Sequence, residues 1–417
     1  METVARPTQQ VVVVGSSLAG LRACETLRQQ AFDGSIVLIG AEPHLPYDRP
    51  PLSKRLLSGE WQVEQIALRK PEALAELNLT LRLGVRAASL DTAAQMVQLA
   101  DGSSVRYDAL VIATGASCRR LPGQPSLEGV HELRTLDDAL ALRDHLVRHP
   151  AGQRMVVIGA GFIGLEAAAT ARSGYGAEVT VLEGLPAPLV RGLGEQMGRA
   201  VAQVHADHGV EIRCGVQVAA IEGDGTRVTG VRLGDGEVVP ADLVLVGIGV
   251  SPNTGWLEGS TLTIRDGVVC DATLCAGVPG VYAAGDIARW PNDLFGEEMR
   301  VEHWTTAAEQ GAAAASNLLA AARGDSPSPY SSVPFFWSDQ YDAKIQYLGR
   351  GSGDDEVRIV AGSVEERRFV ALYGSQGRLR AALGVSMPKM VMPFRRLLAE
   401  RVSWDDALRF AAERSAG

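Results

Sequence analysis

The sequence predicts an α/β fold in which one strand–helix–strand unit occurs twice and a third region follows. A valine-rich strand, a glycine-rich loop, a helix and a second strand closed by a carboxylate appear near the N-terminus and again from Met155. A turn-rich linker, Gly324–Pro329, separates these units from the third region. A chain of 417 residues with 46% hydrophobic content is long enough for two or three domains.

The first unit has the pattern of a strand buried on both faces of a parallel sheet, followed at once by a tight turn into a helix. Its expected parts are the strand Val11–Val14, the loop Gly15–Gly20, the helix Leu18–Gln30, the strand Ile36–Ile39 and the acid Glu42. Glycines let the backbone approach a pyrophosphate at the helix N-terminus, and the acid hydrogen-bonds ribose hydroxyls. Ser17 replaces the second glycine of this loop, which weakens the first copy taken alone.

The second unit carries the complete Gly-x-Gly-x-x-Gly pattern. Its expected parts are the strand Met155–Ile158, the loop Gly159–Gly164, a helix to about Arg172, the strand Val179–Leu182 and the acid Glu183. The acid follows the loop by about 20 residues, the usual distance for a dinucleotide site. Cofactor binding therefore explains this copy better than packing alone.

Two further segments each combine an apolar strand with a tight turn. Tyr107–Ala116 contains Ala-Thr-Gly at residues 113–115, and Val278–Asp286 ends in Gly-Asp. As patterns alone, both indicate no more than a buried strand followed by a turn.

The charge balance argues against nucleic acid or an anionic membrane as the main partner. The net charge is −9 at pH 7, whereas such partners favour basic surfaces. Met1–Gln10 is polar without a signal-peptide core, and the apolar stretches are too short to span a bilayer. We expect a soluble cytoplasmic protein.

The cysteines and histidines indicate neither a disulfide framework nor a metal site. Five cysteines are scattered along the chain, as is common in a reducing compartment. His205 and His208 lie three residues apart but have no cysteine or carboxylate companion, so we interpret them as a partly exposed helix face. No metal is expected.

Taken in order, the four segments resemble the flavoprotein superfamily with two dinucleotide-binding domains that includes glutathione reductase. The resemblance implies an FAD-binding domain at residues 1–120 and 246–325, an inserted NAD-binding domain at 121–245 and a C-terminal α+β domain at 326–417. It also implies these FAD contacts: Gly15, Ser17, Leu18, Ala19, Gly20, Glu42, Val85, Ala113, Thr114, Gly115, Gly285 and Asp286.

Three segments narrow the resemblance: Leu45–Lys54, Glu302–Trp304 and Phe336–Gln340. They are similar to the oxygenase-coupled ferredoxin reductases. This resemblance implies an NADH:ferredoxin oxidoreductase that passes hydride from NADH to FAD, then single electrons to a ferredoxin of the 2Fe-2S or 3Fe-4S type. The ferredoxin would serve a haem-thiolate monooxygenase or a Rieske dioxygenase. The working form is expected to be a monomer or weak dimer.

The same resemblance implies a catalytic pair, Lys54 and Glu166. A cation near the flavin stabilises charge on the reduced ring, while the carboxylate orients the lysine and the nicotinamide. The alternative, a solvated helix charge and a loop lysine, stays open. Further implied FAD contacts are Arg49, Lys54, Arg134, Glu302, His303 and Trp304. The implied nicotinamide-dinucleotide contacts are Gly159, Gly161, Phe162, Ile163, Gly164, Glu183 and Gly249.

No cysteine lies in Pro50–Leu57, where disulfide reductases of the superfamily carry their redox pair. Electrons would then pass directly from the reduced flavin to an external acceptor. Cys270 and Cys275 have the spacing of such a pair, but they lie just before the Gly-Asp strand, so we interpret them as structural.

Several specificities stay open. Glu183 favours NADH because it repels a 2′-phosphate, but Arg191, in the loop that follows, would partly tolerate NADPH. A rubredoxin reductase or general NADH-dependent acceptor reductase would share every motif. A redox-sensing flavoprotein like the apoptosis-inducing factors fits less well, because we find no targeting segment or long insertion. Docking of an acidic ferredoxin would use Arg69, Lys70, Lys344, Lys389, Arg395 and Arg396.

Overall fold

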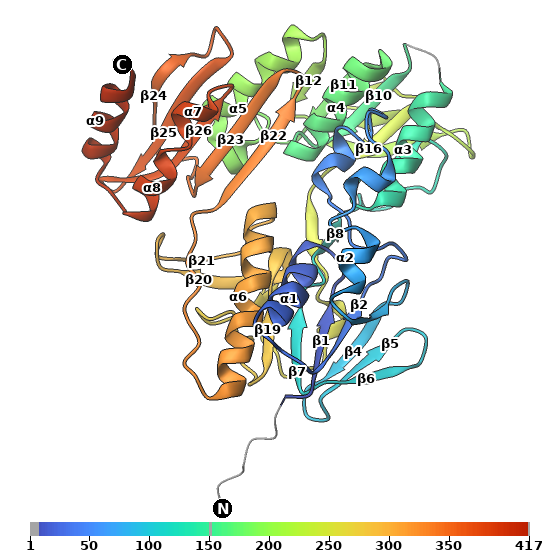
Figure 1. Cartoon of the computed structure of the whole chain (residues 1–417). Helices are drawn as coiled ribbons and strands as arrows, with labels where there is room; N and C mark the ends of the chain where they lie inside the picture. Colours follow the sequence, from blue (N-terminus) through green and yellow to red (C-terminus); the bar gives the residue numbers. More distant parts are fainter. Residues whose placement is uncertain (1–7, 150–151, 416–417) are drawn as a thin grey trace, which may run out of the picture. The chain divides into compact units, whose positions relative to one another are not determined.

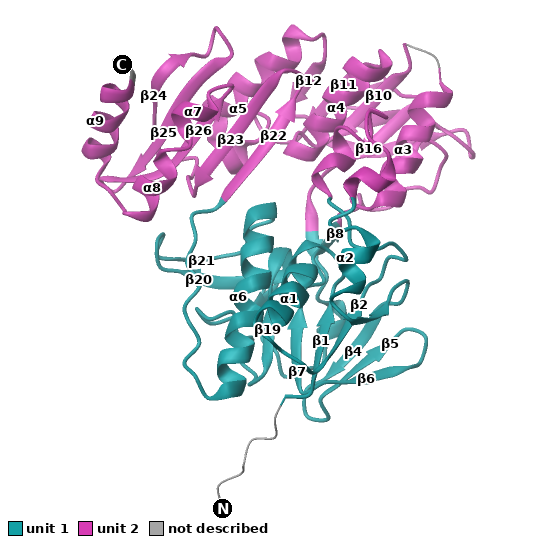
Figure 2. Ribbon diagram, in the orientation of Figure 1, with its two compact units in different colours: residues 1–48, 67–117, 251–334 teal, residues 49–66, 118–250, 335–417 magenta. Residues whose placement is uncertain are grey.

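The computed structural model describes residues 8–149 and 152–415 and divides the chain into two compact units. Unit 1 comprises residues 1–48, 67–117 and 251–334, and unit 2 comprises residues 49–66, 118–250 and 335–417 (Figures 1 and 2). The chain passes between the units near the short strands β8 (Ala116–Cys118) and β17 (Val250–Pro252).

Unit 1 is built on a five-stranded parallel sheet. Its strands, in sheet order, are β19 (Val281–Ala283), β7 (Ala109–Ile112), β1 (Gln10–Val14), β2 (Ser35–Ile39) and β3 (Leu79–Arg82). The side chains of Val11, Val12 and Val13 are fully buried, which explains the unbroken valine run of this central strand. Helices α1 (Leu18–Gln29) and α6 (Trp304–Arg323) pack against each other beside the sheet (Figure 1).

Smaller elements complete unit 1. They are α2 (Pro71–Ala75), the antiparallel strands β4 (Ala87–Asp91), β5 (Met96–Leu99) and β6 (Ser104–Arg106), and the strands β18 (Val268–Val269), β20 (Ala288–Asn292) and β21 (Glu297–Met299). The expected linker at residues 324–329 is extended but anchored. Asn317 of α6 accepts a hydrogen bond from the amide of Ser328 at 2.8 Å and donates one to its carbonyl at 2.9 Å.

Unit 2 contains the second parallel sheet, again with five strands. In sheet order they are β12 (Glu211–Cys214), β11 (Glu178–Glu183), β10 (Arg154–Ile158), β16 (Leu243–Val246) and β9 (Val130–His131). The accompanying elements are α3 (Leu136–Arg148), α4 (Phe162–Tyr175), α5 (Val190–Asp207) and the strands β13 (Val218–Gly223), β14 (Val228–Leu233) and β15 (Val238–Pro240). Both predicted strand–helix–strand units are therefore confirmed.

The third region forms an antiparallel sheet with three short helices, as the expected α+β character requires. Its strands, in sheet order, are β22 (Phe335–Gln340), β23 (Ala343–Gly349), β26 (Arg378–Val385), β25 (Arg368–Ser375) and β24 (Glu356–Ser363), and its helices are α7 (Pro388–Val391), α8 (Phe394–Ala399) and α9 (Trp404–Ser415). This sheet belongs to unit 2, and Tyr373 of β25 donates a hydrogen bond to the carbonyl of Leu193 in α5 at 2.8 Å.

Residues 49–66 also belong to unit 2, because hydrogen bonds hold them to α4. Thr170 donates to the carbonyl of Ser53 at 2.8 Å, and Tyr175 donates to the carbonyl of Leu57 at 2.5 Å. The segment contains two 3₁₀ turns, η1 (Pro50–Ser53) and η2 (Val63–Ile66). It is thereby fixed beside the helix that follows the second glycine loop.

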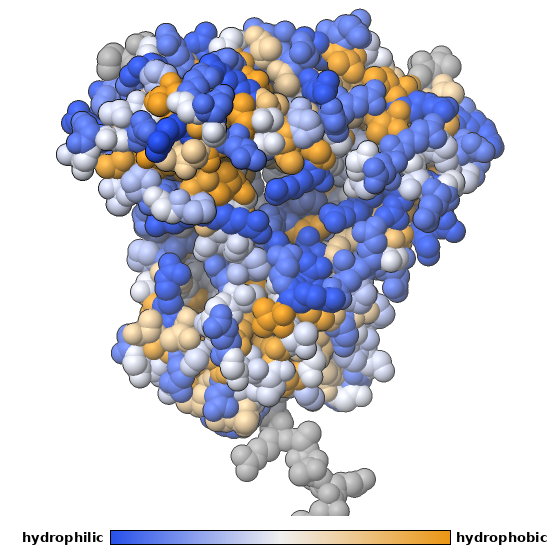
Figure 3. Space-filling model, turned by 180° about the vertical axis from the view of Figure 1, so that it is seen from behind, coloured by the Kyte–Doolittle hydropathy of each residue, from blue (hydrophilic) through white to orange (hydrophobic). Residues whose placement is uncertain are grey.

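Within the described residues, none of the helices combines the length and apolar character that crossing a bilayer requires. Figure 3 shows small groups of hydrophobic residues scattered among hydrophilic ones on the face in view.

Candidate functional site

The predicted FAD residues of unit 1 follow the carboxyl ends of neighbouring parallel strands. Gly15 follows β1, Glu42 lies beyond β2, Ala113–Gly115 follow β7, and Gly285–Asp286 follow β19. Carboxyl ends of parallel strands share one edge of a sheet, and ligands of such sheets bind there. The fold therefore gathers four motifs that are spread over 270 residues of sequence at one edge.

The glycines of the first loop are required by close backbone approaches. Gly15 has φ of +121°, and a Cβ there would lie 2.0 Å from the carbonyl oxygen of Ala113. A Cβ at Gly20 would lie 1.8 Å from the carbonyl oxygen of Gly15. Sequence reasoning missed Gly311 of α6. A Cβ there would lie 2.2 Å from the carbonyl oxygen of Ala19 in α1. Side chains at these positions would open the turn and separate the two helices.

The N-termini of α1 and α4 suit an anion. Neither helix has an acidic residue in its first turn, and Ser17 and Gly161 at their N-caps provide no side-chain capping bond. By contrast, α3 starts with a capping box between Thr135 and Asp138. Unsatisfied amides and the helix dipole attract negative charge, so the two loop helices fit the pyrophosphates of two dinucleotides. Leu18, Ala19, Phe162 and Ile163 lie in these first turns.

Glu42 and Val85 lie on the loops beyond β2 and β3. The hydroxyl of Tyr47 donates a hydrogen bond to the Glu42 carboxylate. The amide of Val85 donates to the carbonyl of Gly40 at 3.0 Å, and the amide of Gly84 donates to the carbonyl of Glu42 at 2.9 Å. The main-chain bonds fix the loops, and Tyr47 holds the Glu42 carboxylate.

Asn253 braces the Ala-Thr-Gly turn, a role that sequence reasoning missed. Its side-chain amide donates to the main-chain carbonyl of Thr114 at 2.8 Å, and its main-chain carbonyl accepts from the Thr114 hydroxyl at 3.1 Å. Its own amide donates to the carbonyl of Gly115 at 2.9 Å. The turn is therefore held on both sides by a residue about 140 positions away.

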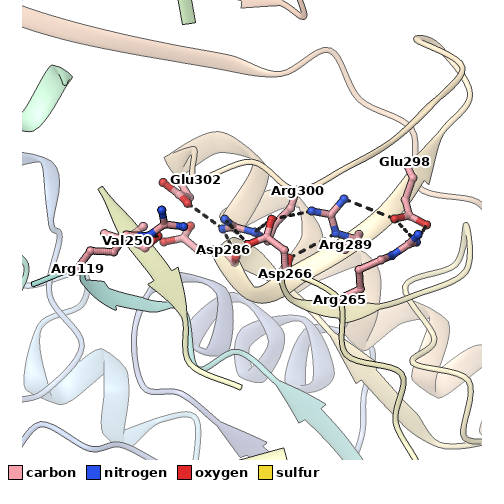
Figure 4. A network of polar contacts seen from close by, with 9 residues as sticks. All are labelled: Arg119, Val250, Arg265, Asp266, Asp286, Arg289, Glu298, Arg300 and Glu302. Atoms are coloured by element: carbon pink, nitrogen blue, oxygen red, sulfur yellow. Dashed lines mark hydrogen bonds and ion pairs between the residues drawn. The ribbon is translucent and has the colours of Figure 1, made fainter. Parts of the chain in front are cut away.

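Arg300 joins two motifs that the sequence presents separately. Its guanidinium donates to the carbonyl of Asp286 at 2.9 Å and to the carboxylate of Glu302 at 2.8 Å (Figure 4). Asp266 pairs with both Arg300 and Arg289. Burial alone would raise the pKa of Asp266, but these two guanidinium groups outweigh burial and leave the pKa below its ordinary value. The Gly-Asp turn and the Glu-His-Trp segment are thus one connected structure.

Gln310 of α6 is fully buried beside the same turn. Its carbonyl oxygen accepts a hydrogen bond from the amide of Gly285 at 2.9 Å. Its buried side-chain nitrogen has no acceptor in the part of the chain that the structure describes. Such a donor is costly unless a bound group satisfies it, so this position fits a cofactor site.

Trp304 connects the Glu-His-Trp segment to the Leu45–Lys54 segment. Its indole nitrogen donates a hydrogen bond to Asp48 at 2.6 Å, and His303 forms the N-cap of α6 directly before it. Arg49 follows Asp48 in the sequence and belongs to unit 2, where its guanidinium donates to the carbonyl of Arg134 at 2.5 Å. Trp304 and Arg49 are therefore each held by a hydrogen bond to a residue far away in the sequence.

The second glycine loop distinguishes packing glycines from a ligand glycine. Gly159 has φ of +100°, and a Cβ there would lie 2.4 Å from the carbonyl oxygen of Gly247. A Cβ at Gly164 would lie 2.5 Å from the carbonyl oxygen of Gly159. Gly161 has an ordinary backbone, and a Cβ there would meet no atom within 4 Å. Protein packing does not require this glycine, but close approach of a pyrophosphate would.

Glu183 at the end of β11 is oriented by two backbone amides. Ala160 donates to its carboxylate at 2.8 Å and Leu185 donates at 2.9 Å. Gly249 lies beyond β16, which β10 separates from β11 in the sheet, and its carbonyl accepts from the amide of Arg119 at 2.9 Å. The predicted nicotinamide-dinucleotide residues thus share the carboxyl edge of the second sheet.

Lys54 and Glu166 form the predicted ion pair. The Lys54 ammonium lies 2.7 Å from the Glu166 carboxylate, whose side chain is 2% exposed. Ser53 donates to the same carboxylate at 2.5 Å, and Ser338 of β22 donates at 2.6 Å. A buried carboxylate needs such partners, so Glu166 is no solvated helix charge. Neither serine was assigned a role from the sequence.

Two expectations need correction. His205 is fully buried rather than partly exposed. Gln340, the last residue of β22, hydrogen-bonds its Nε2 at 2.8 Å, and the ring of Tyr341 packs edge-on against it. Arg191 lies in the first turn of α5 rather than in a loop, although Gly194 with φ of +75° interrupts that helix. For His205, the available sequence signal was the alternation of β22. Its polar residues Ser338 and Gln340 are buried on either side of exposed Asp339, so they require buried polar partners.

The cysteines are all free thiols. Cys270 donates a weak hydrogen bond to the carbonyl of Val268 and Cys275 donates one to the carbonyl of Val278. Burial raises the pKa of both thiols, so neither favours the reactive thiolate. Among the described residues, His, Cys, Asp and Glu form no group that could hold a metal ion.

Comparison with known proteins identifies the family. Residues 9–311 match the family described as pyridine nucleotide-disulphide oxidoreductase, and residues 335–414 match one described as reductase C-terminal. Rhodocoxin reductase of Rhodococcus erythropolis is 37% identical over 93% of this chain and 89% of its own length. Apoptosis-inducing factor 3 of Homo sapiens is 34% identical, over 93% of this chain and 63% of its own length.

The solved structures include the covalent putidaredoxin reductase–putidaredoxin complex, which has a TM-score of 0.90 and 32% identity and covers 99% of this chain and 100% of that one. The sequence similarity, the similarity of fold and the two glycine loops all indicate the same family. The chain belongs to the pyridine nucleotide-disulphide oxidoreductase family, whose cofactors are FAD and NAD(P)H.

Proposed function

We propose that this chain is an FAD-dependent NADH:ferredoxin reductase of an oxygenase system. The observation that carries the proposal is the ion pair between Lys54, on a segment that contains no cysteine, and the buried Glu166 of α4, in a chain with two glycine loops. The names of the relatives support it, since one is named a ferredoxin–NAD(P)⁺ reductase and another is named the ferredoxin–NAD⁺ reductase component of an anthranilate 1,2-dioxygenase system. The proposed FAD domain is residues 1–120 and 246–325, and the proposed NAD domain is residues 121–245.

Bound FAD would accept hydride from NADH and release electrons singly, which is the chemistry that the protein itself lacks. The residues of the chain bind and orient. Asp286, fixed by Arg300, and Glu42, fixed by Tyr47, would hold FAD. Glu183 would hold the adenosine ribose of NADH, because its acceptor oxygens are already oriented by amides.

Lys54 would act as a fixed cation. Glu166 accepts from Lys54, Ser53 and Ser338, so the ammonium is held in one place by a carboxylate that is itself immobilised. A preoriented charge stabilises developing negative charge without the reorganisation that water would need.

Docking of an acidic ferredoxin is proposed at the third region. Lys344 on β23, Lys389 on α7 and Arg396 on α8 are exposed, whereas Arg69 of unit 1 compensates the buried Glu25 at 2.5 Å. We expect reversal of Lys389 and Arg396 to slow ferredoxin reduction about tenfold at low salt by weakening steering. Reversal of Arg227 and Arg232 changes the net charge equally and serves as the control.

The test is NADH-dependent reduction of purified ferredoxins and of a rubredoxin, followed spectroscopically. Multiple turnovers with a ferredoxin support the proposal. Faster turnover with the rubredoxin would favour the alternative acceptor reductase. FAD reduction by NADH without turnover on any acceptor would favour a redox-sensing role like that suggested by the apoptosis-inducing factor likeness.

A further inference from the structure

A chain of hydrogen bonds extends from the Lys54–Glu166 pair into the third region. Ser338 donates to Glu166 at 2.6 Å, and the side-chain amide of Gln340 donates to the Ser338 hydroxyl at 3.1 Å. The Gln340 carbonyl oxygen lies 2.8 Å from His205 Nε2, and the Tyr341 hydroxyl lies 3.3 Å from His205 Nδ1. Every one of these residues lies in unit 2.

The direction of each hydrogen bond follows from the Glu166 end of the series. Glu166 as a carboxylate accepts only, so the Ser338 hydroxyl must donate to it and can accept from Gln340. The Gln340 oxygen then accepts a hydrogen bond from the protonated Nε2 of His205, which leaves Nδ1 to accept from the Tyr341 hydroxyl. Each bond is polarised in the same direction, toward Glu166.

Burial makes this chain more than a chance arrangement. Ser338, Gln340 and His205 are fully buried, and polar groups in such places destabilise a fold unless their hydrogen bonds are made. The residues come from β22 and α5, which are separated by more than 130 positions in the sequence. Hydrophobic residues would fill the same positions without that requirement, so the polar set calls for a reason.

We propose that Ser338, Gln340 and His205 are positioning residues for Glu166 and, through it, for Lys54. The sheet of the third region then helps set the geometry of hydride transfer in addition to any role in docking. The proposal rests on the proposed function, because it assigns Lys54 and Glu166 to the reaction between NADH and FAD. None of the three residues touches the reacting atoms in this account; each acts through Glu166.

This series of hydrogen bonds orients Glu166 and does not conduct protons. A carboxamide at Gln340 interrupts the path, because its nitrogen does not readily lose a proton to the serine. Burial, opposed in part by the Gln340 bond, lowers the pKa of His205 to about 4, and burial also raises the pKa of Tyr341. His208, whose ring stacks on Tyr341, also lowers the pKa of His205. The imidazole therefore stays neutral near pH 7, and the direction of the bonds is preserved.

The first test measures FAD reduction by NADH in the holoenzyme by stopped flow. Ser338→Ala should lower the rate at saturating NADH about tenfold, with the dissociation constant of NADH unchanged, because only the orientation of the pair is lost. Ser338→Thr keeps the hydroxyl and should restore the rate to within about twofold. Asp339→Asn, on the exposed face of the same strand, is the matched control and should leave the rate unchanged.

A double-mutant cycle distinguishes positioning from general damage. If Ser338 acts through Glu166, then Ser338→Ala should have no further effect on the rate in a Glu166→Gln protein. Gln340→Met, of similar volume, should lower the rate by about threefold because the serine loses its oriented donor. Additive effects of Ser338→Ala and Glu166→Gln would overturn the proposal, as would a Ser338→Ala enzyme as fast as the wild type.

A second test does not depend on activity. In full-length protein labelled with ¹⁵N at its seven histidines, His205 should show the Nε2–H tautomer, identified by the signal that His205→Asn removes. Gln340→Met should change the proportions of the two tautomers. An Nδ1–H tautomer of His205 in the wild type would contradict the proposed direction of the hydrogen bonds. Failure to reduce any ferredoxin would refute the proposed function and leave these results intact.

Discussion

Arg300 donates one hydrogen bond to the main-chain carbonyl of Asp286 and another to the carboxylate of Glu302. Its side chain is 9% exposed, so this guanidinium is largely removed from water. Charge-assisted hydrogen bonds are strong in such surroundings. The bonds tie the Gly-Asp turn after β19 to the segment that leads into α6, two places at which FAD binding is proposed.

Arg300→Met should therefore weaken FAD retention. The variant keeps much of the side-chain volume but leaves the Asp286 carbonyl and the Glu302 carboxylate without this donor, at a cost of about 1–3 kcal/mol. We expect the dissociation constant of FAD to rise about tenfold, measured by reconstitution of the apoprotein with FAD. Arg265→Met, which removes an exposed guanidinium bound to Glu298, is the control. Equal FAD affinity in both variants would contradict this role.

Gly159 and Gly161 should respond differently to alanine. Gly159→Ala places a side chain at positive φ against the carbonyl of Gly247 and should destabilise the protein by about 2 kcal/mol or more. Gly161→Ala meets no protein atom and should leave the melting temperature almost unchanged. It should nevertheless raise the dissociation constant of NADH about tenfold, measured by titration, because the methyl group lies where a pyrophosphate approaches. Unaltered NADH binding would show that the nucleotide does not approach Gly161.

Replacement of Glu183 should shift the preference between NADH and NADPH. Its two oxygens are held by the amides of Ala160 and Leu185, so the carboxylate is fixed where a 2′-phosphate would be repelled. Glu183→Ala should lower the ratio of kcat/KM for NADH over NADPH about thirtyfold. Glu178→Ala, at the exposed start of the same strand, should leave the ratio unchanged. A wild-type enzyme that prefers NADPH would contradict the assignment.

The buried His205 predicts loss of stability in mild acid. Its pKa is about 4 in the folded protein because burial disfavours the charged ring, against 6.5 ordinarily. As pH falls below 6.5, the unfolded chain therefore binds a proton that the folded protein does not. We expect His205 to account for about 2 kcal/mol of the stability lost between about pH 7.5 and about pH 5.

Urea unfolding at the two pH values measures this effect. His205→Gln should remove this contribution to the pH dependence. Replacement of His208, an exposed residue at the C-cap of the same helix, by Gln should reduce it much less, because burial is the main cause of the lowered pKa of His205. His131, whose pKa burial and His145 lower to about 4, contributes in the same direction and remains in both variants. The same pH dependence in wild type and His205→Gln would show that His205 is not the group involved.

Local sequence predicted the elements whose determinants are close together in the chain. The valine run of β1 and the glycine loops specify strand, turn and helix within about 30 residues, which is the reach of a strand–helix–strand unit. The resemblance then supplied the roles of Lys54 and Glu166, and the structure brings these two side chains to 2.7 Å.

The residues that sequence reasoning missed depend on distant contacts. Asn253 meets Thr114 across 139 positions, and Ser338 meets Glu166 across 172. No local period or spacing encodes such pairs, because the tertiary fold alone brings them together. The burial of His205 was not predicted for the same reason. Its helix shows amphipathic spacing, but Gln340, which hydrogen-bonds to its ring, comes 135 residues later.

In the proposed function, electrons pass directly from reduced FAD to the acceptor, with no thiol relay. Anaerobic titration of the purified holoenzyme with dithionite measures this directly, because a redox dithiol adds two electrons to the capacity of one flavin. We predict an uptake of two electrons per FAD, since the five cysteines are free thiols and none lies on the Lys54 segment. An uptake of four electrons per FAD would contradict the account.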